Sequence, residues 1–181
     1  MATKTRRAAD MVRLRRMYLD CRHGQLHLTT AFPPSGGFDE RTALLFLHGD
    51  DGTGADFSHC AALLGIDRSV YAPDLPGSGA SDAPAGRATV ANLTAAMADL
   101  LDQLRLREAD IVGCGRGVLV ALELAAARPR EIRRLVIVGG QPPETTPSQP
   151  MLHLDDDSSH AMRDQAASVV ARIRRFLDQA G

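Results

Sequence analysis

Three glycines alternate in the stretch Gly113-Cys114-Gly115-Arg116-Gly117, between a β-branched apolar run and an Ala- and Leu-rich run that is typical of a helix. A strand that turns through such glycines into a helix forms a tight elbow, which presents its middle residue at the edge of a sheet. A serine, cysteine or aspartate at this apex would be a nucleophile for acyl transfer. Gly115 occupies the apex and has no side chain, so the sequence predicts an elbow without a nucleophile.

Other residues near the elbow have side chains that could serve in covalent or proton-transfer chemistry. Cys114 lies one residue from the apex, so its side chain should leave the turn in another direction, and we expect a buried, unreactive thiol. His160 precedes the last predicted helix and is the best candidate for a surviving general base. A histidine without a catalytic role is at least as good an interpretation there. His48 precedes Gly49 at the end of an apolar run, where we expect a structural role in the turn.

Charged residues flank the predicted elbow on two segments. Asp50 and Asp51 follow Gly49, in the region whose backbone N–H groups would stabilise an oxyanion, and two carboxylates there would oppose that charge. Arg116 could offset them, bind an anion together with the helix N-terminus, or form a plain surface ion pair. Asp74 is expected to cap its own turn.

The acidic run Asp155-Asp156-Asp157 lies between His153 and His160. Its spacing fits no pattern of metal ligands, so we expect a solvated acidic turn, and neither a metal nor a cofactor is predicted. The three cysteines have no short spacing, which argues against a zinc site or a disulfide framework and favours a reducing compartment.

Hydrophobic periodicity predicts the elements that must position these residues. Short apolar runs bounded by turn residues predict strands, and apolar positions with a helical period predict helices. The predicted strands are 17–21, 25–32, 43–47, 70–72, the run that ends at the elbow, 135–138 and 151–154, and the predicted helices are 54–64, 87–106, 118–128 and 161–179. Strands that alternate with helices imply a parallel sheet with right-handed crossovers.

Composition predicts one globular domain over residues 17–181, preceded by a basic, flexible arm over residues 1–16. The chain is 44% hydrophobic and 24% charged with a net charge of −1, which is typical of a cytoplasmic globular protein and favours no nucleic-acid partner. It contains no apolar run near the roughly 18 residues that span a bilayer, so no membrane association is expected. The Arg-rich start leaves an organellar transit segment as an alternative.

Four motifs occur in a fixed order along the chain. They are His48-Gly49, the D-x-x-G-x-G-x-S run from Asp74 to Ser81, the elbow, and Ser158-Ser159-His160 before a closing helix. Together they resemble the α/β-hydrolase superfamily, in its esterase, haloperoxidase and meta-cleavage-hydrolase branch, over about residues 17–179. The resemblance implies a three-layer α/β fold with a mostly parallel sheet of about seven strands.

The sequence departs from the family pattern at the catalytic positions. Gly115 stands where the family has its nucleophile, and no lid domain follows the strand predicted at 135–138. In one alignment, the strand that carries the triad acid has no counterpart. A second alignment makes Asp156 or Asp157 that acid but leaves no room for a strand before His160. We therefore expect a lidless, non-hydrolytic pseudo-enzyme that binds a small apolar ligand or a protein partner.

The expected ligand pocket lies above the elbow. Its residues are His48, Gly49, Asp50, Cys114 and Arg116. Two other functions stay open. One is a lyase, cyclase or isomerase, or a weak hydrolase, that uses His160 as its base. The other is an S-adenosylmethionine-binding methyltransferase-like domain, because residues 112–117 also resemble the glycine loop of that family. A sheet that lacks a strand would expose an edge, which pairing in a homodimer would cover.

Overall fold

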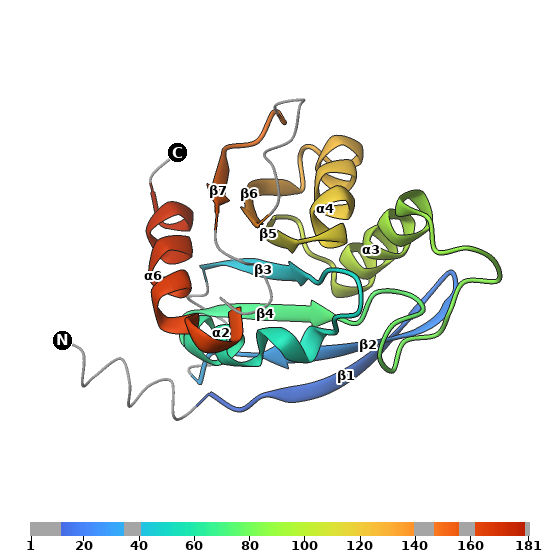
Figure 1. Ribbon diagram of the computed structural model, residues 1–181, viewed down its shortest axis with the longest axis horizontal. Helices are drawn as coiled ribbons and strands as arrows, with labels where there is room; N and C mark the ends of the chain where they lie inside the picture. Colours follow the sequence, from blue (N-terminus) through green and yellow to red (C-terminus); the bar gives the residue numbers. More distant parts are fainter. Residues whose placement is uncertain (1–11, 35–40, 140–146, 156–161, 180–181) are drawn as a thin grey trace.

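The computed structural model describes residues 12–34, 41–139, 147–155 and 162–179, and these form three layers with a seven-stranded sheet in the middle (Figure 1). The sheet order is β1-β2-β4-β3-β5-β6-β7, and β2 runs antiparallel to both β1 and β4 while all other neighbours are parallel. This confirms the predicted fold class. The strands are β1 (Arg15–Cys21), β2 (Gly24–Ala31), β3 (Arg41–Leu47), β4 (Arg68–Pro73), β5 (Ala109–Cys114), β6 (Ile132–Val138) and β7 (Met151–Leu154).

Helices cover both faces of the sheet, and the central strands are apolar on both sides for this reason. On β3, Leu44 and Phe46 face one core, whereas Leu45 and Leu47 face the other. The first core is closed by the 3-10 helix η1 (Gly54–Phe57), α2 (Ser58–Leu64) and α6 (Ala166–Leu177), and the second by α3 (Val90–Leu104) and α4 (Arg116–Ala127). The unbroken apolar run in the sequence is therefore the mark of a strand between two helical layers.

Helix α3 is shorter at both ends than the range 87–106 predicted from its apolar stripe. It begins at Val90 because the Thr89 hydroxyl accepts a hydrogen bond from the Asn92 N–H, 3.2 Å away. It ends where Arg105 adopts a left-handed backbone with φ +53°. Periodicity identified the buried face, and local capping chemistry set the ends.

Strand β1 begins within the range 1–16 that the sequence assigns to a basic arm. Arg15 and Arg16 pair with Thr30 and Thr29 of β2, and Val12 is 9% exposed in the core under α2 and α6. Residues 1–11 lie outside the described part of the chain. Val12, Arg15 and Arg16 of this range thus belong to the core or the sheet, whereas Arg13 and Leu14 are exposed.

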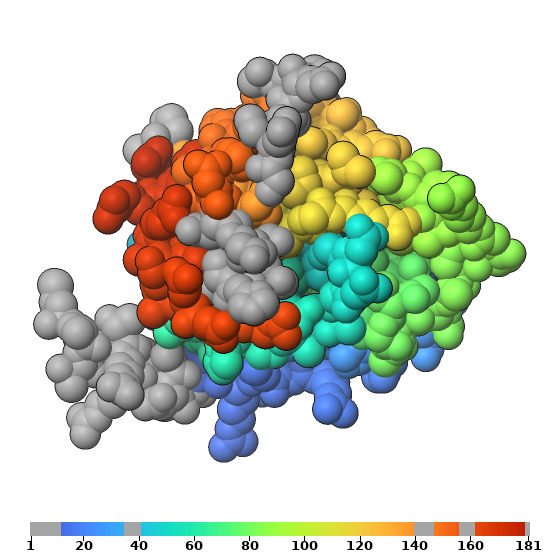
Figure 2. All heavy atoms as spheres, in the orientation of Figure 1, coloured from blue at the N-terminus to red at the C-terminus, as the bar shows by residue number. Residues whose placement is uncertain are grey.

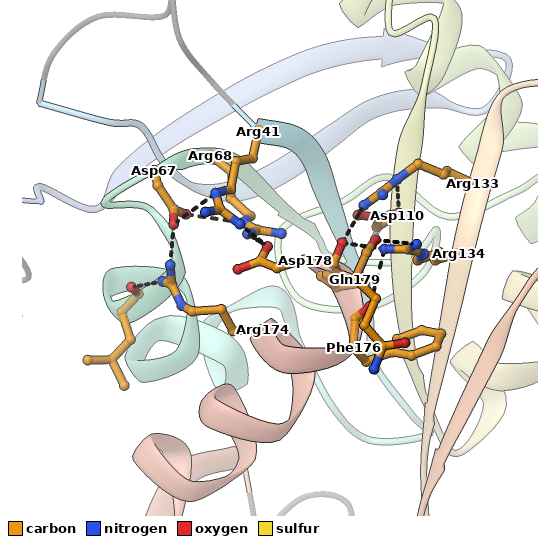
Figure 3. A network of polar contacts seen from close by, with 12 residues as sticks. Arg41, Asp67, Arg68, Asp110, Arg133, Arg134, Arg174, Phe176, Asp178 and Gln179 are labelled. Carbon is orange, nitrogen blue, oxygen red and sulfur yellow. Dashed lines mark hydrogen bonds and ion pairs between the residues drawn. The ribbon is translucent and has the colours of Figure 1, made fainter. Parts of the chain in front are cut away.

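The C-terminal helix is fixed by a network of charged side chains at the amino ends of the parallel strands (Figure 3). Arg134 on β6 donates to the Leu177 carbonyl at 2.5 Å, where a helix C-terminus attracts positive charge. Arg68 on β4 is fully buried and pairs with Asp67 at 3.1 Å and Asp178 at 2.8 Å. This network holds α6 against the sheet at the end remote from the elbow.

The connection from β6 to β7 comprises residues 139–150 and is too short for a separate lid domain, as predicted. Among the described residues, β7 pairs with β6 alone, so the homodimer through a sheet edge stays a prediction. No described helix has the length and apolar character that crossing a bilayer requires.

Candidate functional site

The turn from β5 to α4 is a sharp elbow with a backbone that favours glycine. Gly115 precedes the first residue of α4 and has φ +51° and ψ −123°, a region that other residues rarely adopt. The outer glycines meet a different demand. A Cβ on Gly117 would lie 2.2 Å from the Leu47 carbonyl oxygen, and one on Gly113 would lie 2.9 Å from the Gly117 carbonyl oxygen. The alternating glycines thus combine one conformational and two steric requirements.

Two backbone amides lie beside Gly115. A Cβ on this residue would be 4.0 Å from the Asp50 nitrogen and 3.1 Å from the Gly49 Cα. The second amide is that of Arg116, the next residue in the chain. Within the described residues, neither N–H group has a hydrogen-bond acceptor. An amide after the apex and an amide from the loop after β3 are the two donors of an oxyanion hole at such an elbow.

His48 ties the loop after β3 to the loop after β4. Its Nε2 accepts a hydrogen bond from the Leu75 N–H at 2.8 Å, which leaves the proton on Nδ1 to be donated to the Gly49 carbonyl at 2.7 Å. Both ring nitrogens are therefore engaged in hydrogen bonds, and the residue is only 2% exposed. This geometry gives His48 a positioning role and leaves it no nitrogen for proton transfer to a ligand.

Cys114 is buried in the core beneath α2 and α6, on the side of the sheet away from α3 and α4. Burial, with smaller contributions from the neighbouring Cys60 and Asp56, raises the pKa of its thiol to about 12. The thiolate is the reactive form of cysteine, so this thiol is unreactive near neutral pH. The elbow therefore has no substitute nucleophile at position 114.

Arg116 and Asp50 form an ion pair at the rim of the site. The guanidinium Nη1 lies 3.4 Å from Asp50 Oδ1, and Nη2 donates to the Ala88 carbonyl before α3. The Asp50 side chain is 70% exposed, so the pair is worth little energy. Arg116 thus links the loop after β3 to the start of α3.

Two hollows meet at the elbow, and both are lined by Gly115 and Asp50. The larger, which we call the outer groove, has a volume of about 870 Å³ and lies between α3 and α4, with Val90 and Leu119 among its walls. The smaller, the inner cavity, has a volume of about 180 Å³ and lies on the α2 side. Its apolar walls are Phe57, Cys114 and Met162. In Figure 2, the cyan atoms of the segment after β3 lie beside the yellow atoms of α4, with green atoms of the chain that leads into α3 to their right.

The sequence-predicted residues His48, Gly49, Asp50, Cys114 and Arg116 all lie around these hollows together with Gly115. His160, Asp156 and Asp157 lie outside the described residues. Asp155 is 90% exposed and pairs with His153 at 3.1 Å. In the described ranges, no group of three His, Cys, Asp or Glu side chains is arranged to hold a metal ion.

Asp74 does more than cap its own turn. Its Oδ2 accepts from the Ala80 N–H at 2.9 Å, within that turn, and also contacts His27 Nδ1 at 2.9 Å. Its Oδ1 accepts from the Gly54 N–H at 2.8 Å. Sequence reasoning missed His27, because a histidine within an otherwise regular strand carries no sign of a partner 47 positions away. The carboxylate fixes β2, η1 and the loop after β4 around the site.

Comparison with known protein families agrees with this architecture. Over residues 42–179 the sequence matches the family described as the alpha/beta hydrolase fold. The chain belongs to this family. It is 33% identical over 133 residues to 2-hydroxy-6-oxononadienedioate/2-hydroxy-6-oxononatrienedioate hydrolase 2 of Pseudomonas putida, an alignment that covers 72% of this chain and 46% of the relative. The matched range runs from β3 to α6 and includes the elbow and both loops of the site.

Solved structures show the same fold. An epoxide hydrolase from Vigna radiata superposes with a TM-score of 0.65 at 23% identity, covering 74% of this chain and 41% of that one. A serine-to-glycine variant of an N-acyl homoserine lactonase, complexed with N-hexanoyl homoserine lactone, has a TM-score of 0.62 at 30% identity and covers 71% and 46%. This α/β-hydrolase chain thus spans less than half the length of these proteins. Membership of this family accounts for the glycine-rich elbow without an S-adenosylmethionine-binding loop.

Proposed function

We propose that this α/β-hydrolase-fold protein binds a small, neutral, carbonyl-bearing ligand over Gly115 without hydrolysing it. The observation that carries the proposal is that, among the described residues, free backbone amides and a missing nucleophile occur together at the elbow. The two amides that would hold a carbonyl oxygen are unpaired within the described residues, yet the apex carries no side chain. Loss of the nucleophile from a catalytic triad lowers turnover by a factor on the order of 10⁶, whereas the amides still favour a carbonyl.

The other reactive groups of the described site support binding over covalent catalysis. The Cys114 thiol is kept protonated by burial, with its pKa at about 12. Both ring nitrogens of His48 are engaged in hydrogen bonds. A covalent mechanism needs a nucleophile within reach of a base, and neither residue supplies one.

The charges around the elbow favour a neutral ligand. Asp50 and Asp51 follow Gly49 on the loop that faces the apex, and their carboxylates oppose a full negative charge near the amides. Arg116 is already engaged by Asp50 and the Ala88 carbonyl, so it offsets this repulsion only in part. An uncharged ester, lactone, amide or ketone meets this field better than a carboxylate does.

A first probe is N-hexanoyl homoserine lactone, because the similar lactonase variant was solved with this compound. Titration of the ¹⁵N-labelled chain should shift the amide signals of Asp50 and Arg116 downfield, as expected when both donate to one oxygen. The lactone should be recovered intact, and hexanoate should shift neither signal. Ring opening at roughly 1 s⁻¹ or faster, the lower end of ordinary enzyme rates, would show a hydrolase instead.

Two substitutions provide a matched control for the site of binding. Gly115→Ala raises a methyl group from the floor between the two hollows, and we expect it to weaken lactone binding at least tenfold. Gly86→Ala adds the same methyl group where no atom lies within 4 Å, and it should bind as the wild type does. Equal binding by both variants would place the ligand away from the elbow and refute the proposal.

A further inference from the structure

The inner cavity offers a place for one end of the ligand. It adjoins Gly115, and its volume of about 180 Å³ exceeds the roughly 150 Å³ of an apolar cavity that holds benzene. A chain of about six carbons is of similar size. The cavity is thus large enough for a medium acyl group and too small for the whole of a lactone conjugate.

Among the described residues, the polar side chains that line the inner cavity have partners already. His48 uses both ring nitrogens, and Asp56 Oδ2 accepts a hydrogen bond from the Thr53 N–H at 3.0 Å. Asp50 also lines the cavity and pairs with Arg116, and the other side-chain walls among the described residues are Phe57, Cys114 and Met162, which are 2%, 5% and 1% exposed. A polar substituent would find no free partner among these side chains, whereas an apolar one would leave water for an apolar surface.

The three apolar walls differ in stiffness. The Phe57 ring stacks on Phe46 with centroids 4.6 Å apart, and Cys114 is fixed at the end of β5. Met162 is an unbranched side chain, and its sulfur lies 3.6 Å from the Cys60 sulfur. Methionine adapts to the space available more readily than a packed ring or a strand residue does. Met162 is therefore the wall that limits how deep a chain can enter.

We infer that the inner cavity receives the acyl chain of a ligand whose carbonyl lies on the Asp50 and Arg116 amides, and that Met162 sets the longest chain accepted. This inference rests on the proposed function and adds an orientation to it. The polar end of the ligand then lies in the outer groove between α3 and α4, which is open and wide enough for a ring.

The test compares butanoyl, hexanoyl and octanoyl homoserine lactones by calorimetry. Each methylene buried in the cavity should strengthen binding about fourfold until the cavity is full. We expect wild-type affinity to rise from butanoyl to hexanoyl and to fall at octanoyl. Met162→Ala removes the side chain beyond Cβ, so it should move the optimum to octanoyl, with about tenfold tighter binding of that compound than the wild type shows.

Three further variants make the outcome decisive. Met162→Leu preserves volume and should keep the wild-type optimum, and Leu119→Ala in the outer groove should weaken all three lactones equally. Cys114→Val narrows the cavity from its rigid side and should move the optimum toward butanoyl, which tests the inference even if Met162→Ala does not fold. An optimum that Met162→Ala and Cys114→Val leave unchanged overturns the inference, as does an optimum that moves in Leu119→Ala. The proposed function survives that result, whereas no binding of any lactone to the wild type ends both.

Discussion

The backbone at the elbow makes a quantitative prediction for Gly115→Ala. At φ +51° and ψ −123°, a residue with a side chain costs on the order of 1–3 kcal/mol. The new Cβ would also lie 3.1 Å from the Gly49 Cα, so the loop after β3 would have to move by a few tenths of an ångström. We therefore expect the folded state to lose stability even though the substitution adds only a methyl group.

A second glycine separates this strain from effects on the unfolded chain. Replacing glycine by alanine restricts the unfolded chain and by itself stabilises a protein by about 0.4–1 kcal/mol. Gly86→Ala should show this effect on the unfolded chain alone, without strain in the folded state. No atom lies within 4 Å of a Cβ at this position, and its φ is not positive. Gly115→Ala should unfold with a free energy about 1–3 kcal/mol below that of Gly86→Ala.

The assay is urea unfolding followed by circular dichroism, because the chain contains no tryptophan to report by fluorescence. Gly117→Ala extends the series, since its Cβ would lie 2.2 Å from the Leu47 carbonyl oxygen, which is backbone and cannot turn aside. Stability should fall in the order Gly86→Ala, Gly115→Ala, Gly117→Ala. If Gly115→Ala is as stable as Gly86→Ala, position 115 does not have the left-handed backbone of an elbow, and the reasoning about the site fails.

Three further predictions concern the groups around the site and the fold. Burial raises the pKa of the Cys114 thiol to about 12, so intact-mass analysis should show no alkylation of Cys114 by iodoacetamide at neutral pH until urea unfolds the chain. The hydrogen bond from Arg22 lowers the pKa of Asp99. This pair therefore stabilises the fold above the unfolded carboxyl pKa near 4, and the contribution is lost as the pH falls. Asp99→Asn should lower the free energy of unfolding by up to about 1 kcal/mol near neutral pH and leave it unchanged in acid, with the exposed Glu108→Gln as the control. Asp74→Ala should lower the free energy of unfolding in urea by about 3–5 kcal/mol, because it leaves His27 and two amides without their acceptor. A loss below about 1 kcal/mol would contradict the conclusion that Asp74 fixes β2, η1 and the loop after β4.

The sequence predicted those parts of the fold that local patterns determine. The run at 43–47 is apolar at every position, which indicates a strand between two layers, and β3 occupies that place. The elbow was readable because alternating glycines have few other uses at the junction of a strand and a helix. The start of α3 could be predicted less well, since the Thr89 cap is a single hydrogen bond that periodicity does not report.

Long-range polar contacts were beyond prediction from the sequence. His27 and Asp74 meet because β2 and β4 are neighbours in the sheet, a pairing that no local pattern encodes. Arg68 is fully buried, against the usual exposure of arginine, because Asp67 and Asp178 approach it from two elements. The buried face predicted for the helix at 161–179 is confirmed. The helix α6 itself, however, begins only after a bend at Gln165.

The central claim is that the elbow holds a carbonyl group but forms no covalent bond to it. The most direct measurement is rapid mixing of the wild-type chain with p-nitrophenyl hexanoate, with nitrophenolate release followed by absorbance. We expect no burst, because no side chain at position 115 can be acylated. A burst that approaches one equivalent of nitrophenolate per chain would show a covalent intermediate and refute non-covalent binding at the elbow.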